Sequence, residues 1–218
     1  MQKKQIALCC SLLLLLLAGC AGPTEYTRPE VQPVPERTAP SGGPGAPIVI
    51  DKPREAVWRQ LMASAPNSNF VVVEASPKTW TLHLRYTGDP KDYIDCGRVR
   101  SPVKTAQGER VYDFAAAKAY QQYELQTGGR LYLVDRRMNI DARASVTLEA
   151  LAQARTRASV ATRYVVTRDQ SVTGNGKPFA LTDTIRFGGQ ENATFPNAPT
   201  NCHATGPFEG EVLGFAKR

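Results

Sequence analysis

Two consecutive stretches of the chain alternate between apolar and polar residues. Apolar side chains occupy every second position from Ile140 to Leu148, and a similar alternation returns from Ala158 to Val166. A period of two is typical of a strand with one buried face. A turn at 152–155 separates the two stretches. The pattern therefore predicts a long β-hairpin in which one face of each arm is polar.

Weaker patterns predict shorter strands on both sides of this hairpin. Thr127-Gly128-Gly129 is typical of a hairpin turn, and Gly188-Gly189 lies between two short apolar runs that predict a last small hairpin. Residues 98–117 have no clear period, and a helix could begin at Phe114. The predicted strands cover 48–50, 70–73, 80–86, 120–125, 131–134, 183–187 and 193–195.

Two other stretches have the spacing of helices. Asp51 is placed as an N-cap with Pro53 in the first turn, and Pro66 with Asn67 ends the predicted helix. Its apolar face consists of Val57, Trp58, Leu61, Met62 and Ala65. A short helix is predicted over 208–216. Helices before and after a run of antiparallel strands predict an α+β fold, with the helices on one face of a curved sheet.

The N-terminus has the layout of a secretory signal, with two lysines before an apolar stretch over 6–18. A membrane-spanning helix needs about 20 apolar residues, and this stretch is shorter. It leads into Leu17-Ala18-Gly19-Cys20, which resembles the lipobox of bacterial lipoproteins. The resemblance implies that residues 1–19 are removed and that Cys20 carries lipid. An uncleaved anchor and a plain signal peptide with a chance cysteine are the alternatives.

The same resemblance implies delivery to the outer membrane, because aspartate retains enterobacterial lipoproteins in the inner membrane at the position that Ala21 occupies here. We therefore expect a periplasm-facing protein that is anchored to the bacterial outer membrane. Residues 20–47 form the lipidated Cys20 and a linker with seven of the 16 prolines. Because Pro-rich chains extend by about 3.1 Å per residue, the linker could hold the domain several nanometres from the membrane. Residues 48–218 have the length of one domain.

The charge of the chain is mildly basic. Removing residues 1–19 takes away two lysines and no acidic residue, so the formal net charge falls from +7 to +5. A nucleic-acid interface needs clustered cations with aromatic platforms, and we expect no nucleic-acid partner because the basic residues are scattered. Contact with anionic lipid or with an acidic partner protein stays open. The scattered cations include Arg98, Arg100, Lys104, Arg110, Arg136 and Arg137.

Two cysteines remain after Cys9 and Cys10 leave with the signal and Cys20 is lipidated. In an oxidising periplasm, Cys96 and Cys202 are expected to form a disulfide. The alternative is a metal site that includes the neighbouring His203. Zinc sites usually contain paired spacings such as C-x2-C, and the sequence has none, so no metal is predicted.

The sequence has no catalytic signature, and we expect neither an enzyme nor a cofactor. A nucleophilic site needs a histidine as base, and the chain has only His83 and His203. A Cys202–His203 dyad would require reduced thiols. Three aspartates spaced by three, Asp89, Asp92 and Asp95, lack the other ligands of an EF-hand and are interpreted as surface carboxylates.

The lipobox, the Pro-rich linker and the helix–strand unit from Val57-Trp58 to Trp80 resemble envelope lipoproteins of the BamC type, a subunit of the outer-membrane barrel-assembly machine. The resemblance implies a helix-grip fold, although such proteins carry two domains and this chain has the length for one. We expect a non-catalytic structural or protein-interaction role with an envelope partner. The alternative is a module that binds a lipid or another apolar molecule between sheet and helix, lined by Trp80, Tyr86 and Tyr164.

Overall fold

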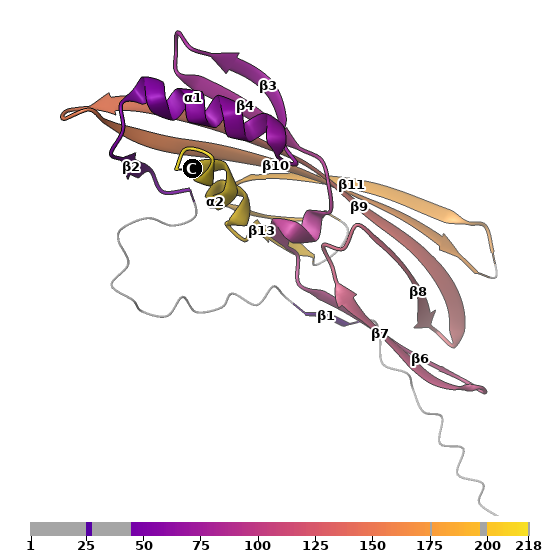
Figure 1. Cartoon of the computed structure of the whole chain (residues 1–218). Helices are drawn as coiled ribbons and strands as arrows, with labels where there is room; N and C mark the ends of the chain where they lie inside the picture. The colour runs from indigo at the N-terminus through magenta and orange to yellow at the C-terminus, as the bar shows by residue number, and fades with distance from the viewer. Residues whose placement is uncertain (1–24, 28–44, 175, 197–199, 218) are drawn as a thin grey trace, which may run out of the picture.

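A hairpin of two long strands forms the spine of the molecule (Figure 1). The computed structural model describes residues 25–27, 45–174, 176–196 and 200–217. Strand β9 (Arg130–Leu151) pairs antiparallel with β10 (Arg155–Thr173), and the pairing runs from the turn at 152–154 to the far end of β10. The hairpin predicted from the alternating residues is confirmed, and both arms are longer than the pattern indicated.

Five shorter strands complete a seven-stranded antiparallel sheet around this spine. Near the β9–β10 turn, β2 (Ile48–Ile50) pairs with β10, and β4 (Thr81–Tyr86) pairs with β9 and with β3 (Val71–Ser76). Towards the other end, β8 (Tyr120–Thr127) pairs with β9, and β11 (Phe179–Gly188) pairs with β10. The predicted turn at Gly128-Gly129 is confirmed, with φ of +55° and +73°.

A second sheet contains β1 (Glu25–Thr27), β6 (Arg98–Thr105) and β7 (Gly108–Ala115). The possible helix at Phe114 is wrong, because Phe114 lies in β7 and packs 5.1 Å from the ring of Tyr123. Part of the linker also differs from the expectation, since β1 pairs with β6. Backbone hydrogen bonds to a strand edge need no apolar side chains, so composition does not exclude such pairing.

A third, small sheet contains β5 (Ile94–Asp95), β12 (Asn192–Thr194) and β13 (Asn201–Ala204). The last hairpin was predicted between β11 and the run at 193–195, and this pairing is wrong, because β12 pairs with β13. After β11 the chain turns, with the Glu191 carboxylate accepting from the Gly188 amide, and leaves the large sheet.

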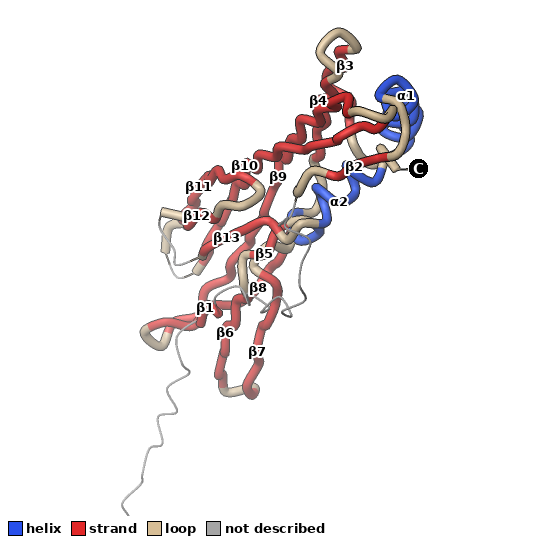
Figure 2. The backbone as a smooth tube through the Cα atoms, turned by 90° about the vertical axis from the view of Figure 1, so that its left-hand side faces the viewer, coloured by secondary structure: helices blue, strands red, loops and turns tan. Residues whose placement is uncertain are grey.

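Helices α1 (Arg54–Ser64) and α2 (Pro207–Gly214) pack on one face of the large sheet (Figure 2). Short 3-10 turns cover Ala65–Asn67 and Pro90–Asp92. The N-cap prediction for Asp51 is wrong. Pro53 takes the cap position because its carbonyl accepts the first helical amides, and it has no side-chain cap bond. The coarse prediction of an α+β fold, mostly antiparallel sheet with two short helices, is confirmed.

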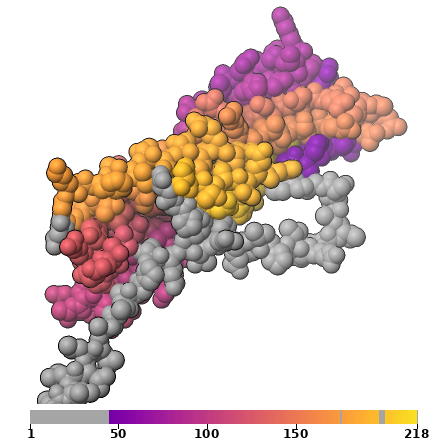
Figure 3. Space-filling view, turned by 180° about the vertical axis from the view of Figure 1, so that it is seen from behind, coloured from indigo at the N-terminus to yellow at the C-terminus, as the bar shows by residue number. Residues whose placement is uncertain are grey.

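The core lies between the helices and the even-numbered residues of β9 and β10. It contains a cluster of aromatic rings, in which Phe208 of α2 lies 5.3 Å from Phe70, 5.1 Å from Tyr93 and 5.7 Å from Tyr164. The molecule is elongated, with the helices at one end and the β6–β7 hairpin at the other (Figures 1, 2 and 3). In the part of the chain that is described, neither helix has the length and apolarity to cross a bilayer.

Candidate functional site

The odd-numbered residues of β9 and β10 form the outer face of the large sheet, opposite the helices. Their side chains are exposed or half-buried along the whole hairpin. Polar and charged groups dominate this face, as the alternating sequence predicted. A broad polar face on a rigid sheet is a surface on which another molecule can dock, so we take it as the candidate site.

Three arginines form a row across the middle of this face. Arg85 of β4 pairs in register with Arg143 of β9, which pairs in register with Arg163 of β10. Neighbouring strands lie about 4.8 Å apart, so the three backbone positions span about 10 Å. All three side chains are exposed. We call Arg85, Arg143 and Arg163 the arginine row.

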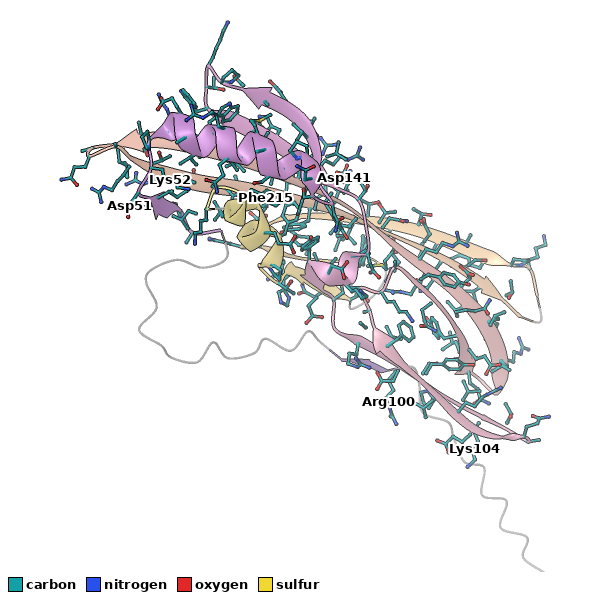
Figure 4. All side chains as sticks on the ribbon, viewed as in Figure 1. Asp51, Lys52, Arg100, Lys104, Asp141 and Phe215 are labelled. Atoms are coloured by element: carbon teal, nitrogen blue, oxygen red, sulfur yellow. A yellow bond between two sulfur atoms is a disulfide. The ribbon has the colours of Figure 1, made fainter. Side chains whose placement is uncertain are left out.

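Asp141, which is labelled in Figure 4, pairs with two of the three arginines. Arg85 donates to it from Nε at 3.0 Å and from Nη2 at 3.2 Å, and Arg143 donates from Nη2 at 3.2 Å. Partial burial raises the pKa of Asp141, but the hydrogen bonds from the two arginines outweigh burial and hold its pKa below the ordinary value. One carboxylate therefore serves two cations.

The guanidinium of Arg163, at the other end of the row, forms no hydrogen bond or ion pair with any residue in the described ranges. It lines an open depression together with Arg143, Ser145, Ala161, Thr162 and Val165. A second depression lies beside Arg85 and Asp141. Guanidinium groups present a planar fork of donors that fits carboxylate and phosphate oxygens. The arrangement can bind an anionic group at Arg163.

The opposite face of the sheet holds a buried carboxylate. Glu209 of α2 is 1% exposed, and its Oε1 accepts hydrogen bonds from the hydroxyls of Thr162 at 2.5 Å and Tyr164 at 2.8 Å. Burial, followed by the charge of Glu209, raises the pKa of Tyr164. These bonds join α2 to β10 through Oε1, whereas Oε2 is buried without a hydrogen-bond partner among the described residues.

The two cysteines that were predicted to pair do so: Cys96 and Cys202 form a disulfide between the end of β5 and strand β13. Since the sulfur of Cys202 is bonded to Cys96, there is no thiol beside His203 for a dyad. Cys20, the predicted lipidation site, lies outside the described residues, as do residues 1–19 and 28–44.

The three loop aspartates do not gather around one empty point: Asp89 and Asp92 both pair with Lys91 Nζ, and Asp95 lies apart from them. Asp89 accepts from the amides of Lys91 and Ala119, Asp92 pairs with Lys91 Nζ at 2.8 Å, and Asp95 accepts from the amide of Gly97. The described residues contain no group of three or more His, Cys, Asp or Glu side chains that could hold a metal.

Most of the aromatic residues that were considered as the lining of a ligand cavity belong to the hydrophobic core. Tyr86 and Tyr164 are 7% and 0% exposed and pack in the aromatic cluster. Trp80 is half-buried, lies edge-on to Trp58 at 5.8 Å and has the guanidinium of Arg54 4.2 Å from its ring. The depressions described above open on the other face of the sheet.

Sequence reasoning missed the arginine row, although a signal for it exists. In a hairpin with a two- or three-residue turn, residues equidistant from the turn face each other. Arg143 and Arg163 are both ten positions from Gln153, so a turn centred there pairs them. Nothing local to Arg85 indicates that β4 lies beside β9, because that pairing is set by the tertiary fold.

The chain matches no protein-family model, no curated protein and no solved structure.

Proposed function

We propose that this chain is a lipid-anchored protein of the bacterial outer membrane with a non-catalytic interaction role, and that its outer sheet face binds an acidic segment of another envelope protein. The observation that carries the proposal is the arginine row with its exposed, unpaired member Arg163 among the described residues. The lipobox resemblance at Cys20 supplies the anchor.

Charge is the physical argument for an acidic partner. Like charges directly opposite each other on neighbouring strands destabilise a sheet, and the row places two such pairs side by side. Asp141 offsets part of this repulsion, but its one negative charge is shared between Arg85 and Arg143. A carboxylate of a partner at Arg163 would reduce the remaining repulsion between the arginines and would accept charge-assisted hydrogen bonds from Arg163.

The non-catalytic part of the proposal rests on the surroundings of the two histidines. His83 Nδ1 is 2.9 Å from Ser145 Oγ on the outer face, and His203 lies beside the disulfide. We extend the proposal to a helix-grip fold of the BamC type. A helix on one face of a curved antiparallel sheet supports this, as does the α1–β4 unit in which Trp58 contacts Trp80.

Site-specific cross-linking in living bacteria tests the partner. A photoreactive phenylalanine analogue is placed at Ala161, which is exposed beside Arg163 on the outer face, and in a matched strain at Lys78, which is exposed in the β3–β4 turn. We expect a discrete protein adduct from position 161 that is absent from position 78.

Charge reversal then tests the chemistry. The variant Arg143→Glu/Arg163→Glu should lose the adduct, whereas Arg59→Glu on the exposed side of α1 should retain it. An adduct that survives the double reversal, or the same adduct from position 78, would contradict the proposal.

A further inference from the structure

The first described strand begins only five residues after Cys20. β1 lies on the edge of β6, with Glu25 opposite Arg100 and Thr27 opposite Arg98. Five extended residues span at most about 18 Å. By contrast, the 27 residues from Cys20 to Pro47 would reach about 84 Å as a Pro-rich extended chain. A lipid on Cys20 is therefore tethered to the edge of β6, close to the folded body.

The antiparallel pairing also sets the direction of this tether. Residue numbers rise along β6 as they fall along β1, so the chain at Glu25 leads back towards Lys104 and the exposed β6–β7 turn. Figures 1 and 4 place Lys104 and this turn at the end of the molecule away from the helices. The anchor therefore attaches at the helix-free end.

The side chains at this end suit a membrane surface. On β6, Arg98, Arg100 and Lys104 point outward and are exposed, while Val99, Ser101 and Val103 between them are buried. The same face also carries carboxylates, because Arg98 pairs with Asp113 at 2.7 Å, Glu109 is in register with Lys104, and Glu25 is in register with Arg100. Across from Pro102, Val111 of β7 is 46% exposed on the same outward face. Exposed apolar side chains flanked by long cationic side chains can enter the interface of an anionic bilayer. Because the carboxylates offset the cations on this face, the short distance from Cys20 to β1 carries the placement.

The neighbouring turn extends this surface. Lys104 exchanges two backbone hydrogen bonds with the side-chain amide of Gln126 in β8, at 2.8 Å and 2.9 Å. Gln126 is opposite Leu131, which is 40% exposed and follows the exposed Arg130. The β8–β9 turn therefore adds a further cation and a further apolar side chain to the same end.

We propose that the β1–β6–β7 sheet lies against the bilayer that holds the lipid of Cys20, with the β6–β7 turn at the phosphate-bearing headgroups and the helix end of the domain projecting away. This orientation rests on the proposed lipid anchor. It goes beyond the proposed function because it assigns a second surface, separate from the arginine row, to the membrane.

The test uses the full-length, lipidated chain purified from membranes and reconstituted in vesicles of phosphatidylethanolamine and phosphatidylglycerol at 3:1. A photoreactive phenylalanine analogue is placed at Gln107, in the exposed β6–β7 turn, or at Ala152, in the exposed β9–β10 turn at the opposite end. We expect lipid adducts at position 107 in at least fivefold excess over position 152.

A variant that releases β1 from β6 tests the role of this strand, and an alanine variant at the same two positions is its matched control. Tyr26→Pro/Thr27→Pro removes two consecutive backbone donors from β1, which should free the strand from β6, while Tyr26→Ala/Thr27→Ala keeps both donors. The proline variant should lower the lipid adducts at position 107 to the level at 152, and the alanine variant should leave them unchanged.

The outcomes separate the two proposals. Equal lipid adducts at 107 and 152, adducts at 107 with a second copy of the chain in place of lipid, or no effect of the proline variant would each overturn the orientation. Mass spectrometry of the N-terminal peptide is read in parallel. If Cys20 carries no lipid, the anchor in the proposed function fails as well.

Discussion

Removal of the Cys96–Cys202 disulfide is expected to destabilise the protein strongly. Both residues are fully buried, and the bond closes a loop with a sequence separation of 106. In the chain-entropy model, cross-linking a loop of this length lowers the entropy of the unfolded chain enough to contribute about 4.8 kcal/mol at 25 °C. The variant Cys96→Ala/Cys202→Ala should lose about this free energy of unfolding.

Urea unfolding followed by circular dichroism measures the loss, in a Cys20→Ser background that avoids lipid. With a denaturant dependence of about 2 kcal/mol per M, 4.8 kcal/mol lowers the midpoint by about 2.4 M. The slope should rise, because the unfolded chain without the cross-link exposes more surface. Reduction of the parent protein with dithiothreitol should reproduce the curve of the variant. A midpoint shift below about 0.5 M would refute the reasoning.

Two further predictions concern one carboxylate and two glycines. The lowered pKa of Asp141 means that its ion pairs stabilise the fold above the ordinary carboxyl pKa and lose this contribution as the pH falls through the folded-state value. Asp141→Asn should therefore lower the free energy of unfolding at pH 7 by less than about 1 kcal/mol for such exposed partners, seen as a small drop in the urea midpoint, and have no effect near pH 2; an equal loss at both pH values would contradict this. A Cβ at Gly189 would lie 2.5 Å from Thr162 Oγ1, whereas one at Gly210 in α2 would meet nothing within 4 Å. Gly189→Ala should lower the free energy of unfolding by about 1–3 kcal/mol through overpacking, and Gly210→Ala should raise it by about 1 kcal/mol through helix propensity. Calorimetry should show a lower melting temperature for the first variant and a higher one for the second; the reverse order would contradict the packing.

The β9–β10 hairpin could be predicted because the residues that specify it lie within the two strands and the turn between them. Apolar and polar residues alternate strictly from Ile140 to Leu148 and with few exceptions from Ala158 to Val166, and a short turn fixes the register of β9 and β10, so most of the buried and polar faces follow from the sequence. The helix around Val57 and Leu61 was found for the same reason, since its apolar residues recur at helical spacing and both are fully buried.

The rest depends on pairings between distant segments. In β6, Val99, Ser101 and Val103 are buried at every second position, but the serine among them hides the period in the sequence. In β7, the residues from Gly108 to Val111 are all exposed, so no alternation marks this strand. The arginine row needs β4 to lie beside β9, at a sequence separation of about 60 residues. The strand at 25–27 forms on an edge that the linker composition does not reveal.

The buried charges also could not be predicted from the sequence alone. Arg168 and Asp183 face each other across β10 and β11 as a buried ion pair, with Arg168 also 4.5 Å from the ring of Phe195. Both positions belong to the core face of their strands, where the alternation alone predicts apolar residues. A buried pair of this kind can be recognised only once the register of the two strands is known.

Mass spectrometry of the mature N-terminus, taken from the membrane fraction of bacteria that express the full chain, tests the central claim most directly. The account predicts that the N-terminal peptide begins at Cys20 and carries a diacylglyceryl group on the sulfur and an acyl chain on the amine. An unmodified Cys20, or a peptide that still contains residues 1–19, would contradict both the anchor and the orientation derived from it.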